Sequence, residues 1–354
     1  MFDILSRLIE INTINDKDNN LFIEYISSFL SKRGFTIQEI KNEEGNKCLV
    51  AKTHDICTLG FLGHSDTVGV SNNWNTEPLK LTIKDSNLYG RGVCDMKGGI
   101  AAFLDVVNDL DISKLKKGLM IIITFDEEIG FKGINLIKDR DDIPNNILIG
   151  EPTDLEPIAY LKGCMEFNAK FYGKSVHSSV MPFGDNAILS ANKFINELVD
   201  FSKKLENEKN NGFTIPYTTM NVALIKGGTS INIVPDECNL SFDFRTVFSE
   251  QHQLIINEIN ELGKKYNSNI DIITNVYPSN NEDKEKLKVI EKITGKKISG
   301  MNYVTEGNFL VGKNVVVLGP GPVTAHEDNE HVSISSYNTT KEVYKKIIEE
   351  YCMR

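Results

Sequence analysis

Hydrophobic positions in the first half of the chain follow two alternating spacings. Residues 20–34 carry apolar side chains at helical intervals and end on a glycine, and residues 97–110 repeat that spacing, which predicts two helices. Short apolar runs bounded by turn residues separate them and are typical of buried strands. Together these patterns favour a sheet with helices on its faces. The predicted strands are 47–53, 57–63, 118–125 and 146–150.

The pattern changes near residue 160, where apolar and polar residues begin to alternate as in half-exposed strands. A strand, a helix, two strands, a helix and a strand follow in that order, which is typical of a ferredoxin-like unit. After about residue 276 the chain returns to helix and strand alternation and ends on a helix at 336–351. We therefore expect a mixed-sheet α/β domain formed by 1–160 and 276–354, with a ferredoxin-like α+β domain inserted at 161–275. The elements predicted for the inserted domain are 163–172, 185–208, 217–226, 236–245, 249–265 and 268–273.

Histidines and carboxylates follow the predicted strands of the first domain. Because α/β sheets bind ligands at the carboxyl ends of their strands, we expect these side chains to meet there. Histidine together with carboxylates is a ligand set suited to zinc or a related divalent ion. The residues concerned are His64, Asp95, Glu127, Glu128, Glu151 and His326.

Each of these residues also has a simpler interpretation. His64 could be a solvated loop histidine, and Asp95 could cap the helix that follows it. The acidic run at 126–128 could be a solvent-facing turn. The glycine-rich stretch 89–99 looks like a phosphate loop, but its spacing fits neither GxGxxG nor the Walker motif.

Composition narrows the function classes. A net charge of -10 argues against a nucleic-acid partner, which needs clustered Lys and Arg. The apolar runs are too short to predict a membrane-spanning helix. The six cysteines form no C-x-x-C pair, which favours reduced thiols and a cytoplasmic protein.

An ordered set of motifs runs through the chain: GHSDTV at 63–68, YGRGVCDMKGG at 89–99, DEE at 126–128, GEPT at 150–153, GKSVHSS at 173–179 and AHEDNE at 325–330. With these motifs the chain resembles the acetylornithine deacetylase/succinyl-diaminopimelate desuccinylase/carboxypeptidase family of di-metal hydrolases, over essentially its whole length.

The resemblance implies two divalent metal ions, Zn²⁺ or alternatively Co²⁺, bridged by Asp95. His64 and Glu151 would hold one ion, and Glu128 and His326 the other. It also implies a homodimer formed through the inserted domain.

Further roles follow from the same resemblance. Glu127 would be the general base, and Asp66 would orient His64 by accepting its second ring N–H. His177 would stabilise the tetrahedral oxyanion, within one subunit or across the dimer. Asn232 and Arg245 would bind the substrate carboxylate, although Arg245 could instead form an ordinary ion pair with Asp243 or Asp236.

The substrate expected from the resemblance is a small N-acyl amino acid. GEPT at 150–153 and TEGNF at 305–309 resemble acetylornithine deacetylases, and Glu306 could face the side-chain amine of ornithine. We expect hydrolysis of N-acetylornithine to ornithine and acetate, a step of arginine biosynthesis. The alternatives are a succinyl-diaminopimelate desuccinylase, an acetyl-lysine deacetylase, a metallo-carboxypeptidase or dipeptidase, and a non-catalytic binding protein.

Overall fold

A computed structural model describes residues 2–14, 18–281 and 283–354. The chain forms two compact units. The first contains residues 1–159, 281–299 and 309–354, and the second contains 160–280 and 300–308. The second unit thus takes in 276–280 and 300–308, which the sequence boundaries place with the first domain. No helix of the described residues is long and apolar enough to cross a membrane.

The first unit is built on a mixed sheet with the order β1-β2-β6-β3-β7-β15-β8. Its central strands β6, β3, β7 and β15 are parallel, and β6 is buried along its whole length. The outer strands β1, β2 and β8 run antiparallel to their neighbours. These strands are β1 (Thr36–Lys41), β2 (Lys47–Lys52), β3 (Cys57–His64), β6 (Gly118–Thr124), β7 (Asn146–Ile149), β8 (Ile158–Leu161) and β15 (Asn314–Val317).

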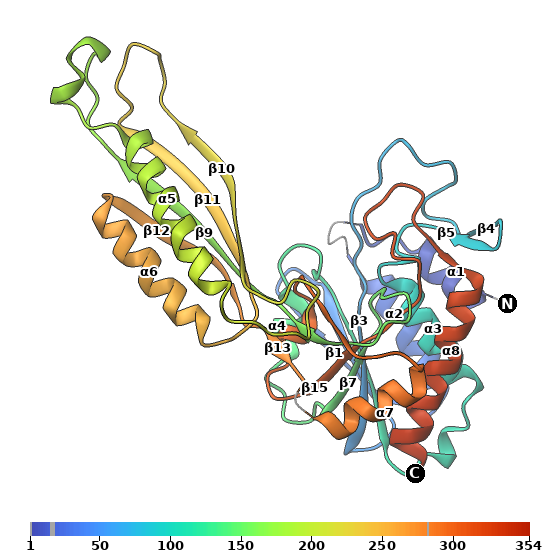
Figure 1. Cartoon of the computed structure of the whole chain (residues 1–354). Coiled ribbons are helices and arrows are strands. Elements are labelled where there is room, and N and C mark those ends of the chain that lie inside the picture. Colours follow the sequence, from blue (N-terminus) through green and yellow to red (C-terminus); the bar gives the residue numbers. More distant parts are fainter. Residues whose placement is uncertain (1, 15–17, 282) are drawn as a thin grey trace. The chain divides into compact units, whose positions relative to one another are not determined.

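Helices α1, α3 and α8 pack together on one side of this sheet (Figure 1). The stacked rings of Phe61 on β3 and Phe103 on α3, with centroids 4.0 Å apart, are part of this interface. The helices of this unit are α1 (Asp3–Glu10), α2 (Asn20–Ser31), α3 (Lys97–Asp109), α4 (Lys132–Ile137), α7 (Lys284–Thr294) and α8 (Ile334–Ile348).

A small antiparallel sheet that the sequence did not predict joins two distant loops of the first unit. Its order is β16-β5-β4, and its strands are β4 (Thr82–Lys84), β5 (Asn87–Tyr89) and β16 (His331–Ser333). His331 pairs with Tyr89, so the segment before Asp95 lies beside the segment after His326.

The second unit is a four-stranded antiparallel sheet with the order β10-β11-β9-β12, and α5 and α6 lie side by side along it (Figure 1). This is the ferredoxin-like order expected from the sequence. Phenylalanines of β9 and β11 pack against α5 and α6 to form its core. Its elements are β9 (Gly163–Tyr172), α5 (Ala187–Leu205), β10 (Thr219–Gly227), β11 (Glu237–Thr246), α6 (Gln251–Lys265) and β12 (Ser268–Val276). The short strands β13 (Ser279–Asn280) and β14 (Ser299–Met301) both pair with β8 and belong to the mixed sheet. The combination confirms the predicted fold class, a mixed α/β sheet with an inserted α+β unit.

Candidate active site

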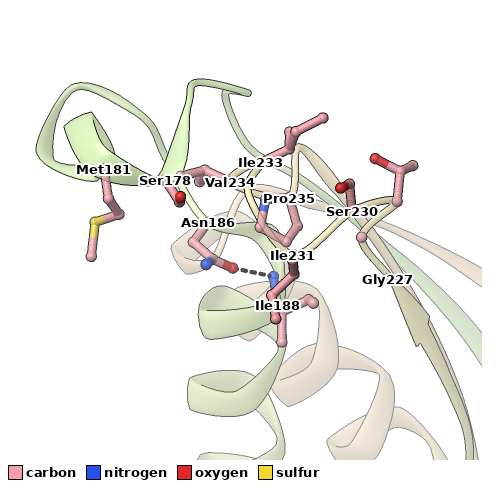
Figure 2. Close-up of a pocket in the computed structure, with 12 residues that line it drawn as sticks. Ser178, Met181, Asn186, Ile188, Gly227, Ser230, Ile231, Ile233, Val234 and Pro235 are labelled. Carbon is pink, nitrogen blue, oxygen red and sulfur yellow. Dashed lines mark hydrogen bonds between the residues drawn. The ribbon is translucent and has the colours of Figure 1, made fainter.

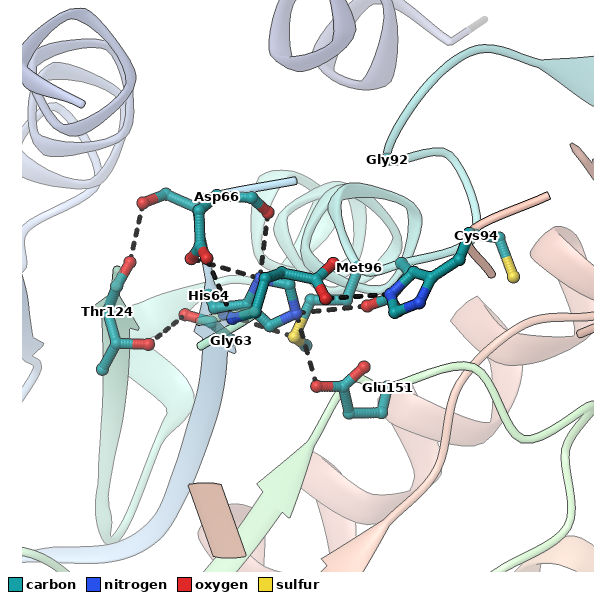
Figure 3. A network of polar contacts seen from close by, with 12 residues as sticks. Gly63, His64, Asp66, Gly92, Cys94, Met96, Thr124 and Glu151 are labelled. Atoms are coloured by element: carbon teal, nitrogen blue, oxygen red, sulfur yellow. Dashed lines mark hydrogen bonds and ion pairs between the residues drawn. The ribbon is translucent and has the colours of Figure 1, made fainter. Parts of the chain in front are cut away.

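His64 ends β3, and its side chain is fully buried at the carboxyl end of the sheet. Its Nε2 lies 3.1 Å from Oδ1 of Asp95 and 3.4 Å from Oε1 of Glu151 (Figure 3). Asp95 precedes α3, and Glu151 follows β7 directly after Gly150. Together they form the His64 group (His64, Asp95 and Glu151), whose ligand atoms all lie within 4.8 Å of one another.

A second set of ligand atoms, the His326 group, contains Asp95, Glu128 and His326. The Nε2 atom of His326 lies 2.8 Å from Oε2 of Glu128 and 3.4 Å from Oδ2 of Asp95. The two carboxylate oxygens of Asp95 therefore face two different histidines. That arrangement suits a carboxylate that bridges two cations.

Asp95 does not cap the following helix. The N-cap of α3 is Met96, and no side chain makes a capping hydrogen bond there. The helix-cap interpretation of Asp95 is therefore wrong, and its carboxylate faces the two histidines instead.

The other ring nitrogen of His64 faces Asp66. Its Nδ1 lies 3.0 Å from the backbone oxygen of Asp66 and 3.5 Å from the carboxylate oxygen Oδ1. The second carboxylate oxygen of Asp66 accepts a hydrogen bond from the backbone N–H of Glu128 at 3.1 Å. The nearest acceptor to Nδ1 is therefore the backbone carbonyl of Asp66 rather than the expected carboxylate, and the Asp66 side chain links the His64 loop to the turn that carries Glu128.

The three acidic residues after β6 have different environments. Asp126, at φ 61°, accepts a hydrogen bond from the backbone N–H of Lys132, so its carboxylate belongs to the turn. Glu128 is half-buried and points to His326. Glu127, also half-buried, lies between them. The simple interpretation as a solvated acidic turn therefore fails for Glu128.

The field of these carboxylates is strongly negative. Burial, followed by the charge of Asp95, raises the pKa of Glu151 to about 8. Hydrogen bonds to Asp95 and Glu128 raise the pKa of His326 to about 10. Burial opposes protonation of His64, yet nearby carboxylates, Glu151 foremost, raise its pKa well above the ordinary value. The site thus draws positive charge to itself, a demand that cations can meet.

His177 and Asn232 meet in the second unit. Ser178 donates its backbone N–H to the carbonyl oxygen of Asn232 at 2.9 Å, and His177 forms a β-bridge with Ile233. His177 is exposed, and its Nδ1 lies 2.7 Å from the Ser179 hydroxyl. These segments border a pocket of about 530 Å³, drawn in Figure 2.

Arg245 and Glu306 lie toward the opposite end of the second unit. Arg245 pairs with Cys164 at the start of β9, whereas the His177 segment follows the end of that strand. The Nε of Arg245 lies 3.1 Å from Oδ1 of Asp243, so the ion pair considered for it does form. Glu306 is buried two residues before Asn308, which donates to the carbonyl of Lys162 next to β9.

Two buried charged residues beside the site were not singled out by the sequence. Glu330 accepts hydrogen bonds from the loop that carries Asp95. Lys97 is fully buried and donates to the carbonyl oxygen of Ile11. Glu330 ends the motif AHEDNE at 325–330, and Lys97 lies within YGRGVCDMKGG at 89–99. Their position in these motifs is the only sequence signal that could have indicated them.

The chain is similar to known proteins over most of its length. Residues 60–350 match the family model described as peptidase family M20/M25/M40. An acetylornithine deacetylase of Photorhabdus laumondii is 32% identical over 96% of this chain and 92% of its own. One of Buchnera aphidicola is 31% identical over 99% of this chain and 97% of its own.

Solved structures share the fold. The aminopeptidase PepT of Bacillus cereus superposes with a TM-score of 0.82 at 21% identity, covering 99% of both chains. The Bacillus subtilis protein YXEP, described as a dinuclear metal-binding peptidase of family M20, gives a TM-score of 0.71 at 14% identity, covering 99% of this chain and 97% of its own.

Proposed function

This chain belongs to peptidase family M20/M25/M40 and is a hydrolase, and we propose that it cleaves the amide bond of N-acetylornithine to give ornithine and acetate. The observation that carries the chemistry is Asp95, whose two oxygens face His64 and His326. The observation that supports the substrate is the similarity to acetylornithine deacetylases along nearly the full length of both chains.

The residues present fit two divalent cations. Each group offers one histidine nitrogen and carboxylate oxygens, donors that suit Zn²⁺ or Co²⁺. Among the described residues, the buried Oε1 of Glu128 has no hydrogen-bond partner, which is costly for a carboxylate unless a cation lies nearby. We assign His64, Asp95 and Glu151 to one ion and Asp95, Glu128 and His326 to the other.

In the proposed mechanism, different side chains transfer the proton, stabilise the oxyanion and hold the histidine ligand. Bound divalent ions would polarise the amide carbonyl as Lewis acids. Glu127 takes a proton from the attacking water and passes it to the leaving amine, so that one carboxyl group acts as base and then as acid. His177 donates a hydrogen bond to the developing oxyanion. Asp66 keeps the His64 ring in place through Nδ1.

Substrate recognition falls to the second unit. The guanidinium of Arg245 suits bidentate binding of the α-carboxylate, with Asn232 as a second polar contact. The carboxylate of Glu306 suits the side-chain ammonium of ornithine. N-acetyl-lysine carries the same ammonium on a side chain one methylene longer, so Glu306 by itself does not separate these two substrates.

The geometry of the second unit supports a homodimer with shared sites. His177 and Asn232 lie beyond one end of the 10-residue strand β11, and Arg245 lies near the other, so about 30 Å separates them. That span is far longer than an N-acyl amino acid. One substrate molecule can therefore contact both Arg245 and the pair His177 and Asn232 only if that pair comes from another copy of the chain.

A substrate panel tests the proposed reaction. The purified chain, loaded with Zn²⁺ or Co²⁺, is assayed on N-acetylornithine, N-succinyl-diaminopimelate, N-acetyl-lysine and a dipeptide. We expect the highest kcat/KM for N-acetylornithine. A higher kcat/KM for another compound of the panel would refute N-acetylornithine as the substrate but would still support amide hydrolysis. No turnover of any compound would contradict both the substrate and the reaction.

Subunit mixing tests the shared site. His177→Ala and Arg245→Ala variants are each expected to be inactive, and they are unfolded together and refolded as a mixture. Half of the dimers then pair the two variants, and each contains one intact site, so about a quarter of the wild-type activity should return. No recovery, with mixed dimers demonstrated by differential tags, would contradict the shared arrangement.

A further inference from the structure

Glu330 is a carboxylate with no solvent exposure and four hydrogen bonds. Its Oε1 accepts from the backbone N–H groups of Cys94 at 2.7 Å and Asp95 at 2.9 Å. Its Oε2 accepts from the backbone N–H of Gly92 at 2.9 Å and from the guanidinium of Arg91 at 2.8 Å. Every donor belongs to the segment that carries Asp95, and charge-assisted bonds of this kind are among the strongest in proteins.

The acceptor comes from a different loop, the one that carries His326. That loop is closed at its base by Thr324, whose hydroxyl donates to the carbonyl of His331 at 2.7 Å and accepts from its backbone N–H at 2.9 Å. Beyond it, His331 pairs with Tyr89 in the small sheet. Glu330 thus links the His326 loop to the Asp95 loop through hydrogen bonds, next in sequence to the β-pairing of His331 with Tyr89.

The His326 loop needs such a support. His326 and Asn329 have φ angles of 64° and 59°, in the left-handed region, which His and Asn adopt more often than other residues with a Cβ but still uncommonly. The His326 side chain is 56% exposed, so burial of the imidazole itself does little to hold it. Strained backbone of this kind persists only where surrounding contacts determine it.

We infer that Glu330 is a positioning residue that sets the distance between Asp95 and His326 and thereby the cation affinity of the His326 group. The inference rests on the proposed function, because it takes that group as a metal site. The His64 group shares Asp95, but its other two ligands, His64 and Glu151, follow the neighbouring parallel strands β3 and β7, so it depends less on Glu330. Loss of Glu330 should therefore weaken one of the two ions selectively.

The test compares wild type with Glu330→Gln. Glutamine keeps the side-chain size, but its NH₂ group is only a donor and would face N–H groups, so about half of the contacts are lost. Apoprotein is titrated with Co²⁺ by calorimetry, and the visible absorption of bound Co²⁺ is recorded at each step. We expect two ions in wild type and, in the variant, one ion bound normally and one weakened about 10- to 100-fold, with altered absorption.

Asp105→Asn is the matched control. Asp105 on α3 contacts the Tyr337 hydroxyl and the Lys341 ammonium on α8, at 3.0 and 3.1 Å, without contacting either ligand loop. The Asp105→Asn variant loses the partly buried ion pair with Lys341 in the same unit. It should bind both Co²⁺ ions as wild type does. Equal weakening in both variants would show a general loss of stability and overturn the inference.

Thr324→Val provides a milder second variant if Glu330→Gln does not fold. It removes only the hydroxyl that closes the His326 loop and should weaken the same ion in the same direction. Two ions with unchanged affinity and absorption in the folded variants would refute the role of Glu330. If wild type itself takes up no Co²⁺, the proposed function fails first, and that result is distinguishable from the others.

Discussion

Replacing Gly99 by alanine should displace the backbone at Gly150, next to the proposed ligand Glu151. Gly99 lies in the first turn of α3, four residues after Asp95, and faces the strand end at Gly150. A Cβ at position 99 would lie 1.9 Å from the carbonyl oxygen of Gly150 and 2.8 Å from its carbonyl carbon. Both atoms are backbone, so no side chain can rotate away, and Glu151 moves with Gly150.

The size of the effect follows from this overlap. Cβ atoms essentially never come within 3.0 Å of such atoms, so α3 and β7 must part by about 1 Å. Alanine favours the helix over glycine by about 1 kcal/mol, but overpacking costs about 1–3 kcal/mol. The net loss of unfolding free energy is therefore about 0–2 kcal/mol. The displacement separates Asp95 from Glu151, however, and a shift of about 1 Å can cost about 100-fold in turnover.

The assay measures three quantities on Gly99→Ala: the unfolding free energy without metal, Co²⁺ affinity and kcat/KM. Gly34→Ala is the control, because Gly34 has φ +86° with open space around it, so alanine there costs about 1–2 kcal/mol from backbone strain alone. We expect the control to lose stability and keep its activity. Wild-type metal affinity and turnover in Gly99→Ala would refute the reasoning.

Further predictions concern the base, the metals and pH. Glu127→Gln should lower kcat by at least about 100-fold, as expected for a lost general base, while metal content by elemental analysis stays near wild type. EDTA should abolish turnover, and Zn²⁺ or Co²⁺ should restore it; an ion at 100 times its Kd should add about 2.7 kcal/mol of stability per site in denaturant titrations. Burial lowers the pKa of His252, so the unfolded chain binds more protons there as the pH falls below about 6.5, and unfolding free energy should decrease in that range. Denaturation at pH 5 to 7 checks this, because His252→Gln should lose less stability than wild type over the same interval.

The order of elements could be predicted from the sequence because hydrophobic spacing is local. The ferredoxin-like unit shows this, since its strands and helices fall within a few residues of the expected bounds, such as β11 at Glu237–Thr246 against 236–245. The small sheet of β4, β5 and β16 was missed. Its strands have three residues each, too short for an alternation to stand out, and β16 pairs with a segment more than 200 positions away.

The sequence by itself determined which side chains follow the buried strands, and therefore that His64, Glu128 and Glu151 would meet at one edge of a parallel sheet. Only the tertiary structure decided how each of them is used. A left-handed φ turns the Asp126 carboxylate back into its own turn, and Glu330 is buried against backbone N–H groups of a loop distant in sequence. The physical reason is that strand periodicity is local, whereas the direction of a carboxylate is set by charges and donors that other parts of the chain bring beside it.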